Sequence, residues 1–218
     1  TKVTKELIEE IKPHTVVNAI GSNPVIPQLP GVNLGLVHNA HDILNEKAHI
    51  TGEGVIIGGG MVGMETAEFV AQKGCKVTGL EMLPDFCLDM GDARKICVTE
   101  SVYAEGINIV TEVIVKEIKV GEVIGIKDGV EVTYPCDAAV IAVGSKSKNG
   151  HDLEETCLEN KIGYFVIGDA GMARKALNAT KEAMEVALTF DDDQVHKEAT
   201  RPKKIVFLTG ATGIMGQE

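Results

Sequence analysis

The strongest pattern in the chain is an uninterrupted apolar run that is followed at once by glycines. Residues 55–57 contain no polar break, which is typical of a strand buried on both faces of a parallel sheet. Glycines occupy positions 58–60, and residues 62–73 then carry apolar side chains on one helical face. Gly74 ends this pattern, and residues 75–80 predict a second buried strand. The stretch therefore predicts a strand, a tight turn, an amphipathic helix and a second strand in immediate succession.

The rest of the chain alternates between helical and strand patterns of ordinary length. Apolar residues at helical spacing predict helices at residues 3–11, 38–44, 92–104 and 176–190. Runs rich in β-branched residues predict strands at residues 15–20, 107–110, 113–120, 123–127, 130–134, 138–145 and 164–169, and a last strand from Ile205. Two stretches predict no sheet or helix: an extended crossover that contains Pro24, Pro27 and Pro30, and a polar loop at residues 146–161.

Turn signals between residues 113 and 134 predict an antiparallel meander of three strands. Gly121-Glu122 separates the first two strands and Asp128-Gly129 the last two, and Asp-Gly at such a place is a strong hairpin signal. The meander stands where a further strand–helix–strand crossover is expected. The predicted fold class is therefore α/β, with a Rossmann-like, doubly wound parallel sheet and an inserted antiparallel β-meander.

The glycine turn and the start of the helix carry the candidate chemistry. Gly58 permits a tight turn, Gly60 lets a diphosphate approach the backbone, and Gly63 lets the helix pack close to the strand. Unpaired amides and the positive end of the helix dipole point at the same place. This order of elements predicts a dinucleotide site, and the alternative, a tight turn that binds nothing, stays open. The expected binding residues are Gly58, Gly59, Gly60, Met61, Val62, Gly63 and, at the end of the second strand, Glu81.

Glu81 also indicates which pyridine nucleotide binds. A carboxylate can accept hydrogen bonds from both hydroxyls of a ribose, but it repels the 2′-phosphate of NADP(H). No lysine or arginine follows Glu81 until Arg94. NADH is therefore the expected ligand.

Composition and charge narrow the possible partners. The chain has 218 residues, 44% of them hydrophobic, and a net charge of −11, which allows a sizeable core and disfavours nucleic acid and anionic membranes. No apolar run reaches the roughly 20 residues that span a bilayer. The five cysteines are scattered and contain no C-x-x-C pair, which argues against a metal centre or a local redox disulfide. A cytoplasmic location is expected.

Four short segments resemble, in their order, the signatures of flavoproteins with two dinucleotide-binding domains. They are Ala19-Ile20-Gly21-Ser22, residues 58–65, Ala142-Val143-Gly144 and Gly168-Asp169. Within that group, residues 1–190 are most similar to the C-terminal part of the NADH:flavin oxidoreductases related to old yellow enzyme, the 2,4-dienoyl-CoA and enoate reductases. The resemblance implies a fold like that of the pyridine nucleotide-disulfide oxidoreductases, in which an NAD(P) domain interrupts an FAD domain.

The resemblance also implies a division of the chain and further site residues. Residues 1–45 would be an FAD-domain segment and crossover, residues 46–146 the NAD(H)-binding domain, residues 147–193 the returning FAD-domain segment, and residues 194–218 a linker and the start of a further nucleotide-binding domain. Glu65 would lie near the nicotinamide, and Gly21, Gly144, Gly168 and Asp169 would complete the cofactor sites, the last two facing FAD. No side chain here is expected to act as a catalytic acid or base, because nicotinamide and flavin carry the hydride chemistry.

The same resemblance implies parts that the chain lacks. The first FAD strand would lie before Thr1, and a barrel domain with FMN would lie further upstream as a partner. Residues 204–218 instead resemble the opening of an extended short-chain dehydrogenase or epimerase and end within that motif. We therefore expect a truncated, NADH-binding part of a flavin-dependent oxidoreductase. FAD should bind poorly or not at all, unless residues 204–216 fill the vacant strand position within one chain or by exchange in a homodimer.

Two other functions stay open at this point. The first is a module that binds or senses nucleotide without catalysis, which bleaching of a bound flavin by NADH would exclude. The second is part of an NAD-dependent epimerase or dehydratase, which rests on residues 209–216 alone.

Overall fold

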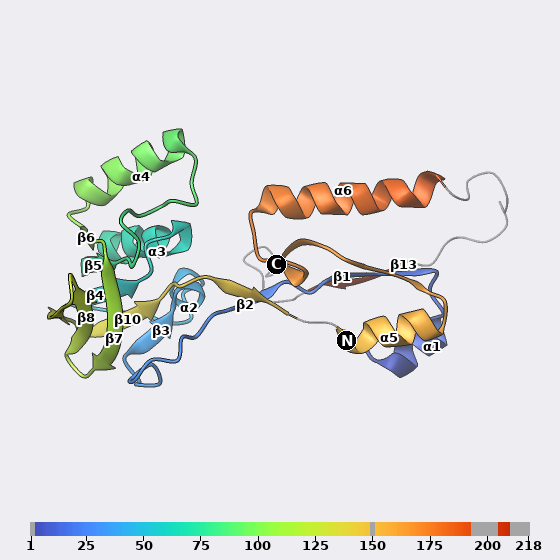
Figure 1. The fold of residues 1–218 in the computed structure, drawn as a ribbon, viewed down its shortest axis with the longest axis horizontal. Helices are drawn as coiled ribbons and strands as arrows, with labels where there is room; N and C mark the ends of the chain where they lie inside the picture. Colours follow the sequence, from blue (N-terminus) through green and yellow to red (C-terminus); the bar gives the residue numbers. More distant parts are fainter. Residues whose placement is uncertain (1–2, 149–150, 193–204, 210–218) are drawn as a thin grey trace. The chain divides into compact units, whose positions relative to one another are not determined.

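The computed structural model describes residues 3–148, 151–192 and 205–209 of the chain. They form two compact units, and the chain leaves unit 1, builds unit 2 and returns to unit 1 (Figure 1). Unit 1 is drawn from Thr1–Asn23 and Ser145–Glu218, and unit 2 from Pro24–Gly144. Most of the proline-bearing crossover therefore belongs to unit 2. Within the described residues, no helix is long and apolar enough to cross a membrane.

A parallel sheet of five strands forms the centre of unit 2. Its elements in chain order are β3 (Val37–Asn39), α2 (Ala40–Leu44), β4 (Glu53–Ile57), α3 (Met61–Gln72), β5 (Lys76–Leu80), α4 (Asp92–Ala104), β6 (Asn108–Val110) and β10 (Ala138–Ile141). The strand order is β3-β10-β4-β5-β6, and every neighbouring pair is parallel. Because α3 connects β4 to β5 and α4 connects β5 to β6, the predicted α/β fold is confirmed.

Different elements cover the two faces of this sheet. Ile56 of β4 packs in one core cluster with Met64 of α3 and Val102 of α4. Val55 and Ile57 belong to a second cluster that includes Val113, Ile118 and Val123 of the meander. Figure 1 shows α3 and α4 on one side of the sheet and the meander on the other. Both faces of β4 are buried, which explains its unbroken apolar sequence.

The antiparallel meander has the three strands that the sequence predicts. They are β7 (Val113–Lys119), β8 (Glu122–Lys127) and β9 (Val130–Pro135), paired in that order. Asp128 and Gly129 have φ values of 52° and 76° at the second turn. Two consecutive residues with positive φ are what a two-residue hairpin with the correct twist requires, and Asp-Gly adopts that conformation readily.

Unit 1 is built around a three-stranded parallel sheet with the order β12-β1-β13. Its elements are α1 (Lys5–Ile11), β1 (Thr15–Ala19), α5 (His151–Glu159), β12 (Gly163–Val166), the 3₁₀ turn η1 (Gly168–Ala170), α6 (Ala176–Asp192) and β13 (Ile205–Thr209). Ile8, Val16 and Cys157 form a small buried core between β1 and the pair α1 and α5. β13 pairs with the whole of β1, from Thr15–Ile205 to Ala19–Thr209. The C-terminal strand therefore extends this sheet.

The structure corrects three predictions of local structure. The polar stretch predicted as a loop contains a helix, because Leu153 and Cys157 lie four residues apart on one face of α5 and pack against the rest of unit 1. The crossover does form sheet at its start, where β2 (Ser22–Pro24) pairs with β11 (Ser145–Ser147). The helical turn expected at residues 38–44 is shorter, because β3 takes its first residues as the edge strand of the parallel sheet.

Candidate dinucleotide site

The fold itself requires glycine at three of the four glycine positions after β4, namely 58, 59 and 63. Gly58 has a φ of 112°, and a Cβ there would lie 2.4 Å from the Ala142 carbonyl oxygen. A Cβ on Gly63 would lie 1.9 Å from the Gly58 carbonyl oxygen. A Cβ on Gly59 would lie 2.8 Å from the Cβ of Glu81. Each of these glycines permits a contact that any side chain would block.

The fold does not require glycine at position 60. Its φ of −72° and ψ of −178° suit any residue. A Cβ there would come no closer than 3.7 Å to another described atom, the Oδ2 of Asp89. The three nearest atoms all belong to the exposed Asp89 carboxylate. The backbone at Gly60 therefore presents a face that is open apart from this side chain, beside the start of α3.

Glu81 is buried at the end of β5, where 8% of its surface is exposed. Its Oε2 accepts a hydrogen bond from the Gly59 N–H at 2.6 Å, and its Oε1 accepts one from the Leu83 N–H at 2.8 Å. The carboxylate therefore fixes both the glycine turn and the loop that follows β5. An ionised carboxylate has about four acceptor positions, so acceptor capacity remains for the hydroxyls of a ribose.

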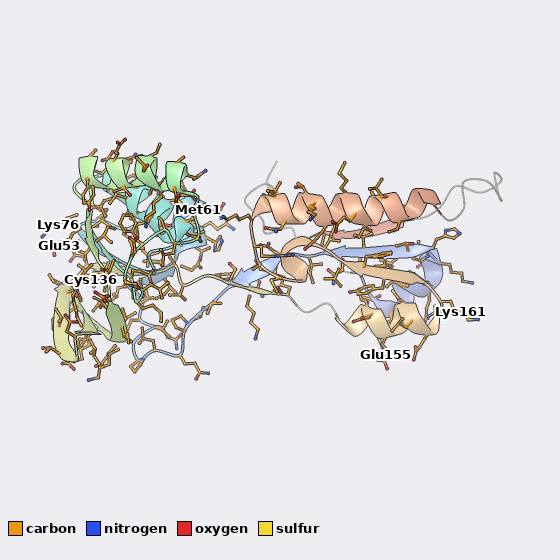
Figure 2. The ribbon with its side chains drawn as sticks, turned by 45° about the horizontal axis from the view of Figure 1, so that its top comes forward. Glu53, Met61, Lys76, Cys136, Glu155 and Lys161 are labelled. Carbon is orange, nitrogen blue, oxygen red and sulfur yellow. The ribbon has the colours of Figure 1, made fainter. Side chains whose placement is uncertain are left out.

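The N-terminus of α3 lies at the same turn. Gly60 is its N-cap and supplies no side chain, so the first amides of the helix depend on other partners (Figure 2, in which Met61 is labelled). The Met61 N–H donates to the Asp89 carboxylate, at 3.2 Å from Oδ1 and 3.3 Å from Oδ2. Sequence reasoning missed Asp89, because it lies 28 residues from Met61 and no local motif links the two.

The glycine turn and Glu81 line one cavity of about 840 Å³ in unit 2. Its other walls come from residues 27–29, the loop between β5 and α4, the start of β7, and residues 142–144. Met82, Leu83 and Ile114 add exposed apolar surface to these walls. A cavity of this size, with apolar walls and a few fixed polar groups, is typical of a small-molecule site.

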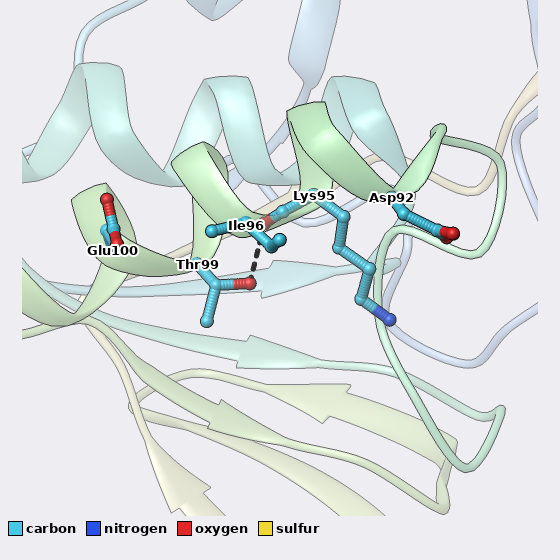
Figure 3. A pocket seen from close by; sticks show the side chains of 5 residues that line it. All are labelled: Asp92, Lys95, Ile96, Thr99 and Glu100. Atoms are coloured by element: carbon cyan, nitrogen blue, oxygen red, sulfur yellow. Dashed lines mark hydrogen bonds between the residues drawn. The ribbon is translucent and has the colours of Figure 1, made fainter.

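A second, smaller depression lies on α4. It measures about 320 Å³ and is lined by Asp92, Lys95, Ile96, Thr99 and Glu100 (Figure 3). One helix supplies all of these side chains, and the Thr99 hydroxyl is already bonded to the Lys95 carbonyl oxygen. No strand end or glycine turn contributes to it, so we assign the candidate site to the larger cavity.

The thiol of Cys87 lines the larger cavity but is unsuited to nucleophilic chemistry. Burial, followed by the nearby Asp89 carboxylate, raises the pKa of Cys87 to about 11. Its backbone N–H donates to the Gly59 carbonyl oxygen at 2.8 Å, and its φ is 53°. Since the thiolate is the reactive form, the role of this residue is to hold the loop against the glycine turn.

Two further residues expected at the site lie in different surroundings. The Glu65 carboxylate accepts from Arg94 at 2.9 Å in an exposed ion pair and does not line the cavity. Gly144 lines the cavity with a φ of 99°, and its carbonyl oxygen accepts from the Val25 N–H at 2.9 Å. The last contact brings the two ends of unit 2 together.

The residues expected to face FAD gather in unit 1. The Ser22 hydroxyl donates to Asp169 Oδ2 at 3.2 Å, which joins the segments after β1 and β12. Gly21 and Gly168 have φ values of 79° and 59° beside this contact. The Gly168 N–H is bonded to Glu182 Oε2 at 2.7 Å. The fold therefore brings Gly21, Gly168 and Asp169 together. The Glu182 carboxylate of α6 already accepts the hydrogen bond of the Gly168 amide.

Comparison with known proteins shows which family shares this arrangement. An NADH oxidase of Thermoanaerobacter brockii is 35% identical over 84% of the chain, which covers 29% of that protein. A dihydrolipoyl dehydrogenase of Acholeplasma laidlawii is 33% identical over 74% of the chain and is covered to 53%. The solved structure of a 2-naphthoyl-CoA reductase complex matches 84% of the chain with a TM-score of 0.76 and 27% identity, and is covered to 28%.

The chain spans less than a third of the length of the NADH oxidase and of the naphthoyl-CoA reductase that it matches. A protein-family model covers most of the chain and names the family. Residues 2–176 match the model described as pyridine nucleotide-disulphide oxidoreductase, a family of flavin-dependent NAD(P)H oxidoreductases. The predicted oxidoreductase class and the cofactor types NAD and FAD are thereby confirmed for the family. The chain belongs to the pyridine nucleotide-disulphide oxidoreductase family.

Proposed function

We propose that unit 2 binds NADH, with the diphosphate at the glycine turn before α3 and the adenosine ribose at Glu81. The observation that carries this proposal is the open face of Gly60, a glycine that the fold itself does not require, beside the first amides of a helix. Those amides and the helix dipole favour an anion. The cavity of about 840 Å³ supplies room for the two nucleosides.

Charge around the site favours NADH over NADPH. Glu81 is the group nearest to the proposed ribose, and a carboxylate there opposes a 2′-phosphate. Arg94, the first basic residue after Glu81, is paired with Glu65. Asp89 adds further negative charge to the cavity wall, whereas the charge of Asp85 is offset by its ion pair with Lys95. The selectivity therefore rests on repulsion of the extra phosphate as well as on hydrogen bonds to the ribose.

The chain acts by holding and orienting the two cofactors. When bound, the nicotinamide and the flavin carry the transfer of a hydride, with NADH as the donor and FAD as the acceptor. In this proposal Gly58–Gly63 and Glu81 hold the dinucleotide, with Gly144 towards its nicotinamide end; Glu65, which lies outside the cavity walls, is given no contact with it. Gly21, Gly168 and Asp169 contribute to the FAD site.

The parent protein is proposed to be an enoate or dienoyl-CoA type reductase, with an upstream barrel domain that carries a second flavin. A cinnamate reductase of Clostridium sporogenes, 31% identical over 84% of the chain, supports this choice, as does the likeness to the naphthoyl-CoA reductase. We also infer a cytoplasmic location, because the five cysteines are free thiols. The likeness of residues 204–218 to a short-chain dehydrogenase is kept as a proposal, and its glycine-rich part lies outside the described residues.

Calorimetric titration of the purified chain with NADH and NADPH tests the proposal. We expect a single NADH site and at least about tenfold weaker binding of NADPH, the effect of one unfavourable charge contact of about 1.4 kcal/mol. No heat of binding with either nucleotide at millimolar concentration would overturn the proposed function. Stronger binding of NADPH would overturn the role given to Glu81.

A further inference from the structure

The first amide of α3 is already bonded to a carboxylate of the same chain. Asp89 reaches the Met61 N–H with both oxygens, at 3.2 and 3.3 Å. These distances are longer than the roughly 2.7–2.9 Å of a strong charge-assisted hydrogen bond. Asp89 is also exposed to solvent. The contact is therefore weak enough for a better anion to replace it.

The same carboxylate also covers the open face of Gly60. The group nearest to a Cβ built on Gly60 is Asp89 Oδ2, at 3.7 Å. The helix amide and the bare glycine are the two features that a diphosphate would use at this turn. Asp89 occupies both, as an anion would.

The backbone that carries Asp89 is held in place by other contacts. The Cys87 N–H donates to the Gly59 carbonyl oxygen at 2.8 Å, and the Met90 N–H donates to the Cys87 carbonyl oxygen at 3.0 Å. The neighbouring Phe86 is buried in the core of unit 2. The Asp89 side chain can therefore rotate away from Met61 while the loop remains where it is.

We propose that the Asp89 carboxylate is an internal competitor of the dinucleotide diphosphate and limits the affinity of this site for NADH. The inference rests on the proposed function, since it takes the glycine turn as the diphosphate site. An anionic ligand must displace the carboxylate before it can reach the Met61 amide. After displacement the carboxylate and the diphosphate still repel each other, so Asp89 weakens binding in both ways.

The test measures NADH affinity in the full chain and three variants by calorimetry. Asp89→Ala removes the charge and the acceptor, and Asp89→Asn removes the charge alone. Asp92→Ala is the matched control, because Asp92 is also exposed, lies three residues further along, and has no bond to Met61. Circular dichroism melting of each variant confirms that it is folded.

We expect Asp89→Ala to bind NADH about two- to fivefold more tightly, the size expected of one exposed charge at a helix N-terminus. Asp89→Asn should show part of the gain, and Asp92→Ala none. Equal affinities in all four proteins, weaker binding by a folded Asp89→Ala, or the same gain in Asp92→Ala would overturn this inference and leave the proposed function standing. Failure of all four proteins to bind NADH would overturn both.

Discussion

Replacement of Gly60 by valine should weaken NADH binding strongly while changing the stability of the fold little. The backbone at Gly60 suits a β-branched residue, and the nearest atom to its Cβ is 3.7 Å away, so the free energy of unfolding should change by no more than about 1 kcal/mol. The valine side chain would instead fill the space of the diphosphate. Loss of two amide–phosphate hydrogen bonds, at about 1.5–3 kcal/mol each, weakens NADH binding by at least about 100-fold.

Two control variants define the assay, which pairs calorimetric titration with thermal unfolding. Gly91→Val changes another N-cap glycine, at φ −76° and with nothing within 4 Å of its Cβ, and should alter neither binding nor stability greatly. Gly63→Ala places a Cβ 1.9 Å from the Gly58 carbonyl oxygen and should destabilise the fold by about 1–3 kcal/mol. A folded Gly60→Val protein that binds NADH as the unmodified chain does would refute the reasoning, because the diphosphate would then lie elsewhere.

Three further predictions concern cofactor choice and thiol reactivity. Glu81→Ala should weaken NADH binding about 10- to 100-fold and reduce the preference over NADPH; an unchanged ratio of the two affinities in a folded variant would contradict the role of this residue. The purified chain should be colourless unless β13, which pairs with the whole of β1, completes the FAD sheet; a yellow preparation that loses its colour when residues 204–218 are deleted would show that the C-terminal strand fills that position. Because burial raises the pKa of Cys87 to about 11, iodoacetamide at pH 8 should alkylate the exposed Cys97 and spare Cys87 in the folded protein, which peptide mass spectrometry can check.

The fold of unit 2 could be predicted because its signals are local. The apolar run of β4, the glycine turn and α3 follow one another without interruption, so each element limits the choices for the next. The hairpin at Asp128-Gly129 was equally accessible, since two positive φ values are required there and few residue pairs supply them. The separate roles of Gly58 and Gly63 also follow from sequence order alone, and the structure supports both with specific contacts.

The features that could not be predicted from the sequence depend on contacts between segments that are far apart in the chain. α5 looks polar because, among its described residues, the apolar side chains that pack in the core of unit 1 are only Leu153 and Cys157. β3 and β2 are three residues long and form where a partner strand is available, not where β propensity is high. Asp89 reaches Met61 across the turn, and Glu182 reaches Gly168 from α6. No spacing rule in the sequence relates these pairs.

The hydrogen bond between Val25 and Gly144 has a consequence for the order in which the chain folds. β1 and β12 are partners in one sheet, and their side chains Asn18 and Tyr164 meet across a separation of 146 residues. If unit 2 folds first, its ends are already joined, and the loop that unit 1 must close is roughly fivefold shorter, which lowers the entropic cost by about 1.5 kcal/mol. Unit 2 is one continuous segment, whereas the sheet of unit 1 pairs strands that are far apart in the sequence, so we expect that sheet to form late. If the chain folds in this order, unit 2 brings the two segments of unit 1 close together before the sheet of unit 1 forms.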